Sequence, residues 1–296
     1  MRTLDLGFKT HIESAMTTLA TCWKITRKDA VTLGFTDHDE TLSFGGTDYR
    51  PAHGLDGGEA SAKLGPQVDT AEVLGVLHSE VITEDDILLG RYDDASVETW
   101  RVNWRDVSQR LLQRRATIGE IVREDGVFRA ELRSGQAALN QVKGRIYSPL
   151  CDAGVGDARC GVDLDTPAFK TDAAVTAIRD RYRIAVSGIE GFPRDWFALG
   201  RARWSSGRRG GIADAVVGQT RLGGEDILSF AQPVGDWVIA GDTLTLTAGC
   251  DRRFATCRDR FANTVNFRGF PHIPGNDFVL RHPKPGSRLE GQALIK

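Results

Sequence analysis

The chain has 296 residues, a formal net charge of -2, 41% hydrophobic residues and 26% charged residues. This composition is typical of globular proteins, and the length suffices for two packed cores. A charge near zero gives no general attraction for phosphate backbones, and no apolar run approaches the roughly 20 residues that a membrane-spanning helix needs. The N-terminal residues also lack the apolar run of a signal peptide, so a cytosolic site of synthesis is expected.

Residues 7 to 24 are predicted to form a helix, because apolar side chains recur at steps of three and four. Those side chains are Phe8, Ile12, Ala15, Met16, Leu19, Cys22 and Trp23. Cys22 lies on this apolar face. A buried core position is favoured for it over a nucleophile, which would need a partnered histidine and an activating environment.

Short alternating runs follow at 24–26, 31–36 and 42–44, and they predict hairpins. Between them stand Asp37, His38 and Asp39, which could ligate a metal in a bent loop. Neighbouring strand residues point to opposite faces, so a turn stabilised by the Asp side chains is favoured. Residues 53–66, rich in Gly and Ala, are expected to be a mobile loop.

Two further β features are expected before residue 134. Trp100, Val102 and Trp104 alternate with polar residues, which predicts a half-buried strand whose tryptophans pack in the core. Residues 117–133 form two apolar runs around Asp-Gly, a strong hairpin signal.

A second β-rich block is predicted from apolar runs at 182–189, 196–204, 227–230, 237–239 and 243–247. Arg208 and Arg209 lie in a glycine loop within this block. No strand, Gly-rich loop and helix ending in Lys-Ser/Thr surround them, so a nucleotide site is not expected.

The predicted fold is therefore mainly β, with two β-rich blocks, an N-terminal helix and an irregular cysteine-rich C-terminal segment. The first β-rich domain with its leading helix is assigned to 1–165, the second to 166–248, and the C-terminal segment to 249–296. This segment is expected to join residues 147–165 in space.

Four cysteines occur in two distant pairs, Cys151 with Cys160 and Cys250 with Cys257. Each pair lies in a segment of Asp, Arg, Gly and Ala that is typical of loops, so burial alone does not explain the thiols. We expect the two pairs to meet in space and to be held together.

Disulfides, a four-thiolate zinc site and an iron-sulfur cluster are the alternatives. Cytosolic thiols normally stay reduced, which disfavours disulfides. Structural zinc sites usually take each ligand pair from a knuckle with two to four intervening residues, whereas these pairs are separated by eight and six. Wider loops can enclose a larger cluster, although neither spacing matches the ferredoxin patterns. The spacing leaves zinc and a cluster open.

Four motifs together resemble one protein family. They are Gly34-Phe-Thr-Asp-His-Asp39, Gly156-Asp-Ala-Arg-Cys160-Gly-Val-Asp163, Gly249-Cys250-Asp, and Asn266-Phe-Arg-Gly-Phe-Pro-His-Ile-Pro-Gly275. The chain resembles the tail-tip (baseplate) hub proteins of siphophage-type tails, and is most similar to those of alphaproteobacterial prophages and gene transfer agents. The minor tail protein L of phage lambda is more distant.

This resemblance implies a structural protein and not an enzyme, and a fold of two β-barrel-like hub domains. It implies a homotrimer at the tail tip of a phage-like particle, assembled in the bacterial cytoplasm, that adapts the distal tail protein ring to a central tip or fibre protein. A tail-associated peptidase is a further candidate partner, and DNA would pass through transiently without sequence-specific binding. It also implies a 4Fe-4S cluster bound by Cys151, Cys160, Cys250 and Cys257, with zinc as the alternative.

Other classes are less well supported by the residues. An iron-sulfur enzyme typically leaves one iron open with three protein thiolates, whereas four are present here without a recognisable acid-base pair. A four-cysteine zinc module that binds nucleic acid would need a basic surface, and the overall charge gives none. His272 is expected to pack near the cysteines and not to act as a ligand.

Overall fold

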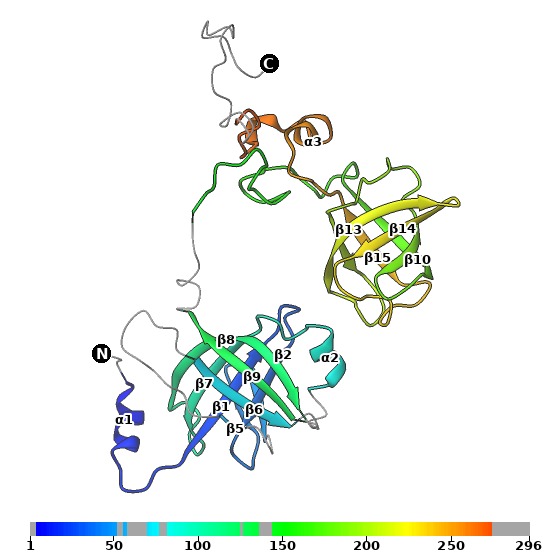
Figure 1. The fold of residues 1–296 in the computed structure, drawn as a ribbon. Helices are drawn as coiled ribbons and strands as arrows, with labels where there is room; N and C mark the ends of the chain where they lie inside the picture. Colours follow the sequence, from blue (N-terminus) through cyan, green and yellow to red (C-terminus); the bar gives the residue numbers. More distant parts are fainter. Residues whose placement is uncertain are drawn as a thin grey trace, which may run out of the picture. The chain divides into compact units, whose positions relative to one another are not determined.

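The computed structural model describes residues 4–51, 56–57, 70–76, 82–124, 127–135 and 144–273. The chain forms two compact units, residues 1–143 and 144–296, and each is described by itself (Figure 1). Among the described residues, no helix is both long enough and apolar enough to cross a membrane. The three-part division expected from the sequence stays a prediction, as does the loop at 53–66, most of which lies outside the described residues.

The first unit is built on one nine-stranded sheet with the order β3-β4-β2-β1-β7-β8-β9-β6-β5. Neighbouring strands of this sheet pair antiparallel, except that β2 and β4 are parallel. Two short helices, α1 (Leu6–Ile12) and α2 (Glu84–Leu88), accompany it. The strands are β1 (Leu19–Thr26), β2 (Thr32–Thr36), β3 (Leu42–Phe44), β4 (Thr47–Pro51), β5 (Asp56–Gly57), β6 (Thr70–Val76), β7 (Ser96–Asn103), β8 (Arg110–Glu124) and β9 (Val127–Ser134).

The predicted helix over 7–24 is wrong beyond Ile12, because residues 19–26 form strand β1. This strand is buried on both faces: Ala20 and Cys22 belong to one core cluster, and Trp23 and Ile25 to another. A strand without a polar face loses its two-residue alternation, so its apolar residues can match a helical spacing by chance. Pairing with β2 and β7 then fixes the extended conformation.

The expected strands and the expected turn of this unit are found among the described residues. The runs at 31–36 and 42–44 form β2 and β3, and residues 97–103 lie in β7, where Val102 is fully buried. Trp104 lies in the turn after β7, and both Trp100 and Trp104 pack, partly buried, against the cluster that contains Val102. Strands β8 and β9 form the expected hairpin. Residues 37–40 form bends, with an Asp37 carboxylate oxygen 2.7 Å from the backbone N of Thr21.

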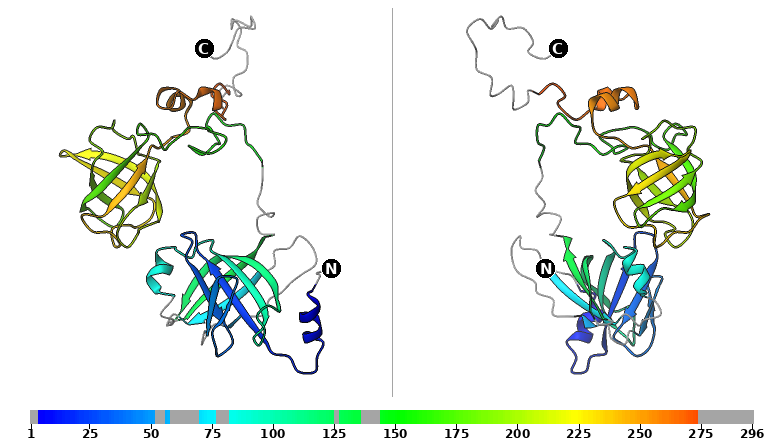
Figure 2. Two further views of the ribbon diagram at one scale, coloured as in Figure 1. Left: turned by 180° about the vertical axis from the view of Figure 1, so that it is seen from behind. Right: turned by 45° about the vertical axis from the view of Figure 1, so that its right-hand side comes forward.

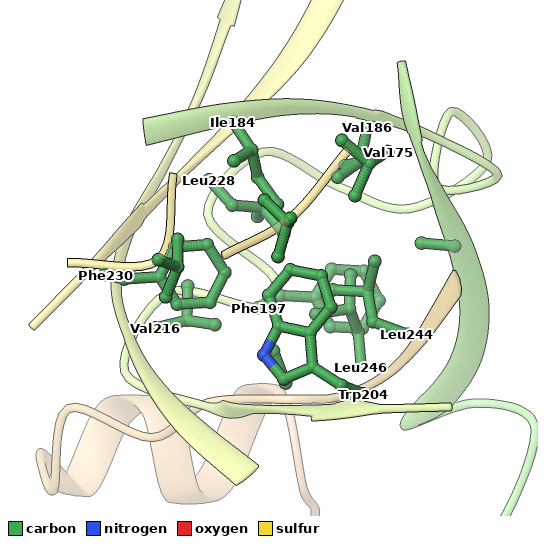
Figure 3. Close-up of a cluster of buried hydrophobic side chains, with 14 of the residues drawn as sticks. Val175, Ile184, Val186, Phe197, Trp204, Val216, Leu228, Phe230, Leu244 and Leu246 are labelled. Atoms are coloured by element: carbon green, nitrogen blue, oxygen red, sulfur yellow. The ribbon is translucent and has the colours of Figure 1, made fainter. Parts of the chain in front are cut away.

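The second unit contains a closed barrel with the strand order β10-β11-β14-β13-β12-β15. Its strands are β10 (Lys170–Ile178), β11 (Arg183–Ser187), β12 (Arg201–Trp204), β13 (Ala213–Leu222), β14 (Glu225–Phe230) and β15 (Thr243–Thr247). Alternate residues of each strand point inward, so β15 places Leu244 and Leu246 in the core with Trp204 and Phe197 (Figure 3). The mainly β prediction is confirmed.

Two strands of the barrel, β10 and β13, were missed, and the strand predicted at 237–239 is wrong, because these residues lie in a turn region. Val238 is nevertheless buried in the barrel core. An apolar residue is needed there for packing, although the backbone does not form a strand. Arg209 is also buried and forms an ion pair with Asp214, while the guanidinium carbon of Arg208 lies 5.4 Å from the ring centroid of Trp237. Both arginines therefore have structural contacts.

Beside the barrel, the second unit carries a small lobe made from residues 144–165 and 249–273. It includes α3 (Phe254–Asp259) and the short 3-10 helix η2 (Thr264–Asn266). In both Figure 1 and Figure 2, α3 (orange) lies next to the green segment that precedes the barrel. The backbone N of Cys151 donates to the carbonyl oxygen of Arg252 over 2.8 Å, which ties the two segments together.

Candidate metal centre

The four predicted cysteines are brought together, although 89 residues separate Cys160 from Cys250 in the sequence. All four line one cavity of the lobe. The rest of its wall is formed by apolar side chains, two arginines and two asparagines: Ala153, Val155, Val162, Phe261, Phe267, Arg252, Arg253, Asn263 and Asn266. A sulfur-rich cavity with apolar, cationic and amide neighbours suits a soft metal or an iron-sulfur cluster.

The loop that carries the first cysteine pair is organised by Asp157. Its carboxylate accepts backbone N–H bonds from Gly154, Arg159 and Cys160 at 2.7, 2.9 and 2.7 Å. These bonds, led by that from Cys160, lower the pKa of Asp157 below its ordinary value. One short acidic side chain thereby fixes an eight-residue connection that has neither helix nor strand.

The second pair begins where the barrel ends. Strand β15 stops at Thr247, and Cys250 follows two residues after the buried Ala248. Arg252 then adopts a left-handed conformation with φ of 64°, a conformation that non-glycine residues rarely adopt. Its backbone N lies 3.3 Å from the Sγ of Cys250, so the tight turn directs an N–H group at that sulfur.

Two glycines allow the close backbone contacts on either side of the site. A Cβ on Gly249 would lie 1.8 Å from the carbonyl oxygen of Ala198, and one on Gly269 would lie 2.6 Å from the backbone of Leu150. Real Cβ atoms do not approach backbone atoms so closely. These contacts explain why glycine stands directly before Cys250 and within the C-terminal aromatic motif.

Arg260 attaches the lobe to the barrel. Its guanidinium donates to the carbonyl oxygens of Gly249 and Trp196 at 2.7 and 3.2 Å. The same group lies 4.8 Å from the ring centroid of Trp196, a cation–π contact. Arg260 thus holds the segment around Cys250 against the barrel by donating hydrogen bonds to backbone carbonyl oxygens.

Three of the sulfurs have N–H neighbours in the described part of the chain. Besides the Arg252 amide at Cys250, the Arg268 backbone N lies 3.4 Å from the Sγ of Cys151, and the Asn263 side-chain N lies 3.7 Å from the Sγ of Cys160. Such donors stabilise thiolate and sulfide charge and are a recognised means of tuning iron-sulfur clusters. The donor set therefore fits an anionic sulfur centre.

The protonation of the thiols follows from burial and from their proximity. Burial raises the pKa of both Cys250 and Cys257, and the nearby Cys151 and Cys160 raise each further. The Cys257 thiol donates to the carbonyl oxygen of Asn263 over 3.2 Å. As the side chains stand, no three His, Cys, Asp or Glu side chains of the described residues are grouped to hold a metal ion. Ligation would require Cys257 to release its proton and turn from Asn263.

The remaining candidate residues lie apart from this cavity or only support it. Cys22 is fully buried in the first unit, as predicted for a core residue. The His272 ring packs near Phe254 with their centroids 6.4 Å apart. Sequence reasoning missed Asp157, Arg260 and Asn263. Their one visible signal was a dense run of Asp, Arg, Gly and Asn around the cysteines, which is equally common in surface turns.

The comparisons with known proteins agree with this architecture. Residues 5–163 match the family model described as baseplate hub protein, N-terminal attachment domain. Residues 195–277 match the family described as phage conserved hypothetical protein BR0599. The first match contains one cysteine pair and the second match contains the other.

A solved structure is similar over almost the whole length. A chain of the virion of the native gene transfer agent (GTA) particle is 39% identical, with a TM-score of 0.90, and the alignment covers 98% of this chain and 100% of that chain. None of the curated proteins searched matches. Two β-rich units with these matches define a structural protein of phage-like tails. The chain belongs to the baseplate hub protein family.

Proposed function

We propose that the protein is the tail-tip hub of a gene transfer agent or related phage-like particle. The observation that carries this proposal is the full-length similarity to a chain of the GTA virion, at 39% identity and a TM-score of 0.90. Similarity of this extent includes both units and the four-cysteine lobe. The role is structural: the protein adapts the distal tail ring to a central tip or fibre protein and forms part of the channel for DNA.

Assembly with other subunits is supported by exposed apolar side chains in each unit. Leu6, the first residue of α1, and Met16, which follows the helix, are 77% and 83% exposed, within the segment that matches the attachment-domain model. In the second unit, Leu222 is 72% exposed at the end of β13, and Tyr147 is 73% exposed in the lobe. Contiguous exposed apolar patches mark contact surfaces, and assembly would bring these four side chains into such contacts. We assign the first unit to the distal tail ring, with three copies forming the hub.

The second unit is assigned the contact with the proteins of the tail tip. The residues around Tyr147 include Phe270 and Ile273, which line an open hollow with it. This apolar surface offers a contact for the central tip or fibre protein, or for a tail-associated peptidase. DNA crosses the hub without being read, which agrees with the near-zero net charge of the chain.

We further propose that Cys151, Cys160, Cys250 and Cys257 hold a 4Fe-4S cluster, with a four-thiolate zinc ion as the alternative. When bound, the cluster supplies four metal–sulfur bonds that close the long chain segment between Cys160 and Cys250. The wide loops, the shared cavity and the N–H groups directed at sulfur support it. Its role is that of a clamp, since the lobe contains little regular secondary structure to hold itself.

Particle assembly tests this proposal. A producing strain that lacks its own hub gene would be complemented with the wild type, Cys151→Ser, Cys250→Ser or Cys22→Ala. We expect both serine variants to yield particles with incomplete tail tips by electron microscopy and little gene transfer, whereas Cys22→Ala assembles. Normal tails with Cys151→Ser and Cys250→Ser would refute the clamp. Normal tails from the strain with no hub at all would refute the hub role itself.

A further inference from the structure

Asn263 occupies a special position between the two cysteine pairs. Its side-chain N donates to the carbonyl oxygen of Cys160 over 2.7 Å and lies 3.7 Å from the Sγ of the same residue. Its backbone carbonyl accepts from the Cys257 thiol, and its backbone N donates to the Cys257 carbonyl oxygen over 3.0 Å. One residue therefore contacts one cysteine from each pair.

The orientation of the Asn263 amide is fixed by its partners. A carbonyl oxygen can accept a hydrogen bond but not donate one, so the NH2 group must face Cys160. The Oδ1 on the other side accepts from the side-chain N of Asn266 over 2.8 Å. In the described part of the chain, the Asn263 side chain supplies the donor at the Cys160 sulfur, while the sulfurs of Cys151 and Cys250 receive backbone donors.

We propose that Asn263 is a positioning residue of the four-cysteine centre: its amide holds the Cys160 loop against the segment that follows Cys257 and directs an N–H at the Cys160 sulfur. This inference rests on the proposed metal centre. The N–H offsets part of the negative charge of a bound cluster, and the bond from the Asn263 backbone N to the Cys257 carbonyl oxygen keeps Cys257 beside the cavity after its thiol has lost its proton. Loss of the N–H therefore both loosens the metal and makes the cluster harder to reduce.

The test uses the full chain purified without air, in wild type, Asn263→Ala and Asn263→Asp. Asn263→Ala removes the donor, and Asn263→Asp replaces it with a carboxylate of nearly the same shape. The matched control is Val265→Asp, which adds the same charge two residues away at a side chain that is 91% exposed. The measured quantities are the reduction potential by voltammetry and the rate of iron loss to a chelator.

For both Asn263 variants we expect a more negative potential and about tenfold faster iron loss, with Asn263→Asp the larger effect. Val265→Asp should stay close to wild type. A merely structural role would lower thermal stability but leave the potential of the intact cluster unchanged, and that result would overturn the inference.

The outcomes separate this inference from the cluster proposal. If the wild type contains one zinc and no sulfide, the cluster proposal fails, and the same variants are compared for zinc loss to a chelator. About tenfold faster zinc loss in both Asn263 variants but not in Val265→Asp would uphold the positioning role. Zinc retention equal to wild type would reject it. A wild type that binds neither metal overturns both proposals.

Discussion

Cys22 differs from the other four cysteines in its surroundings. It is fully buried between strands, with its Sγ 3.5 Å from the hydroxyl of Thr36, and burial raises the pKa of its thiol to about 11. The apolar pattern around it was enough to predict a core position, even though the predicted helix was wrong. The other four share a cavity whose geometry depends on contacts between distant segments, which no local pattern encodes.

The raised pKa of Cys22 predicts a loss of stability at alkaline pH. An unfolded thiol titrates near pH 9, so between pH 9 and 11 the folded state holds a proton that the unfolded state has released. The free energy of unfolding of the first unit should therefore fall as pH rises, by up to about 1.4 kcal/mol per pH unit from this group. Below pH 9 this contribution is constant.

Urea unfolding at pH 8, 9 and 10 measures this effect, with Cys22→Ala as the comparison. The variant should be less stable at pH 8 by about 1 kcal/mol because a small cavity forms, but its stability should fall less steeply between pH 9 and 10. Burial raises the pKa of Tyr49 to about 12, so Tyr49 also lowers the free energy of unfolding as pH rises, mainly above pH 10. Equal slopes in the two proteins would contradict the assignment.

At the scale of single elements, the sequence predicted strands well where one face is polar. β15 was predicted with its observed bounds, and β7 to within a residue or two, because their apolar and polar residues alternate. β1 was mistaken for helix because both of its faces are buried. The lobe could not be predicted in detail, since close glycine contacts and carbonyl-capping arginines leave no periodic signal.

Gly249 links the barrel to the cysteine lobe, so replacing it should affect both. In Gly249→Ala, the added Cβ meets the backbone of residues 198 and 200, which cannot yield as a side chain can. We expect a loss of at least about 2 kcal/mol in unfolding free energy and a lower metal content. Gly191→Ala is the matched control, because a Cβ there meets nothing within 4 Å. Similar stability of the two variants would argue against the close-contact explanation.

The Asp157 loop gives a graded prediction for metal retention. Asp157→Asn can keep the two bonds to Oδ1 and loses the charge, whereas Asp157→Ala loses all three backbone bonds. Metal loss to a chelator should be slowest in the wild type, faster in Asp157→Asn and fastest in Asp157→Ala. Asp165→Ala, which removes an exposed carboxylate paired with Lys170, should leave the rate unchanged. The same rate in all four proteins would show that the loop needs no such support.

For the molecule as a whole, two separate units predict two unfolding transitions. The four-cysteine lobe belongs to the second unit, so metal removal should lower the transition of that unit and leave the other unchanged. Differential scanning calorimetry of the metal-loaded protein, the chelated protein and Cys250→Ser can resolve this. One cooperative transition that shifts as a whole would mean that the units are coupled.

The most direct test of the central claim is chemical analysis of the wild-type protein purified under strict exclusion of air. Iron, acid-labile sulfide and zinc per chain are measured together with the visible absorption spectrum. A 4Fe-4S clamp predicts about four iron and about four sulfide per chain with broad visible absorption. About one zinc per chain, without sulfide or colour, would contradict the cluster and leave a four-cysteine zinc clamp in its place.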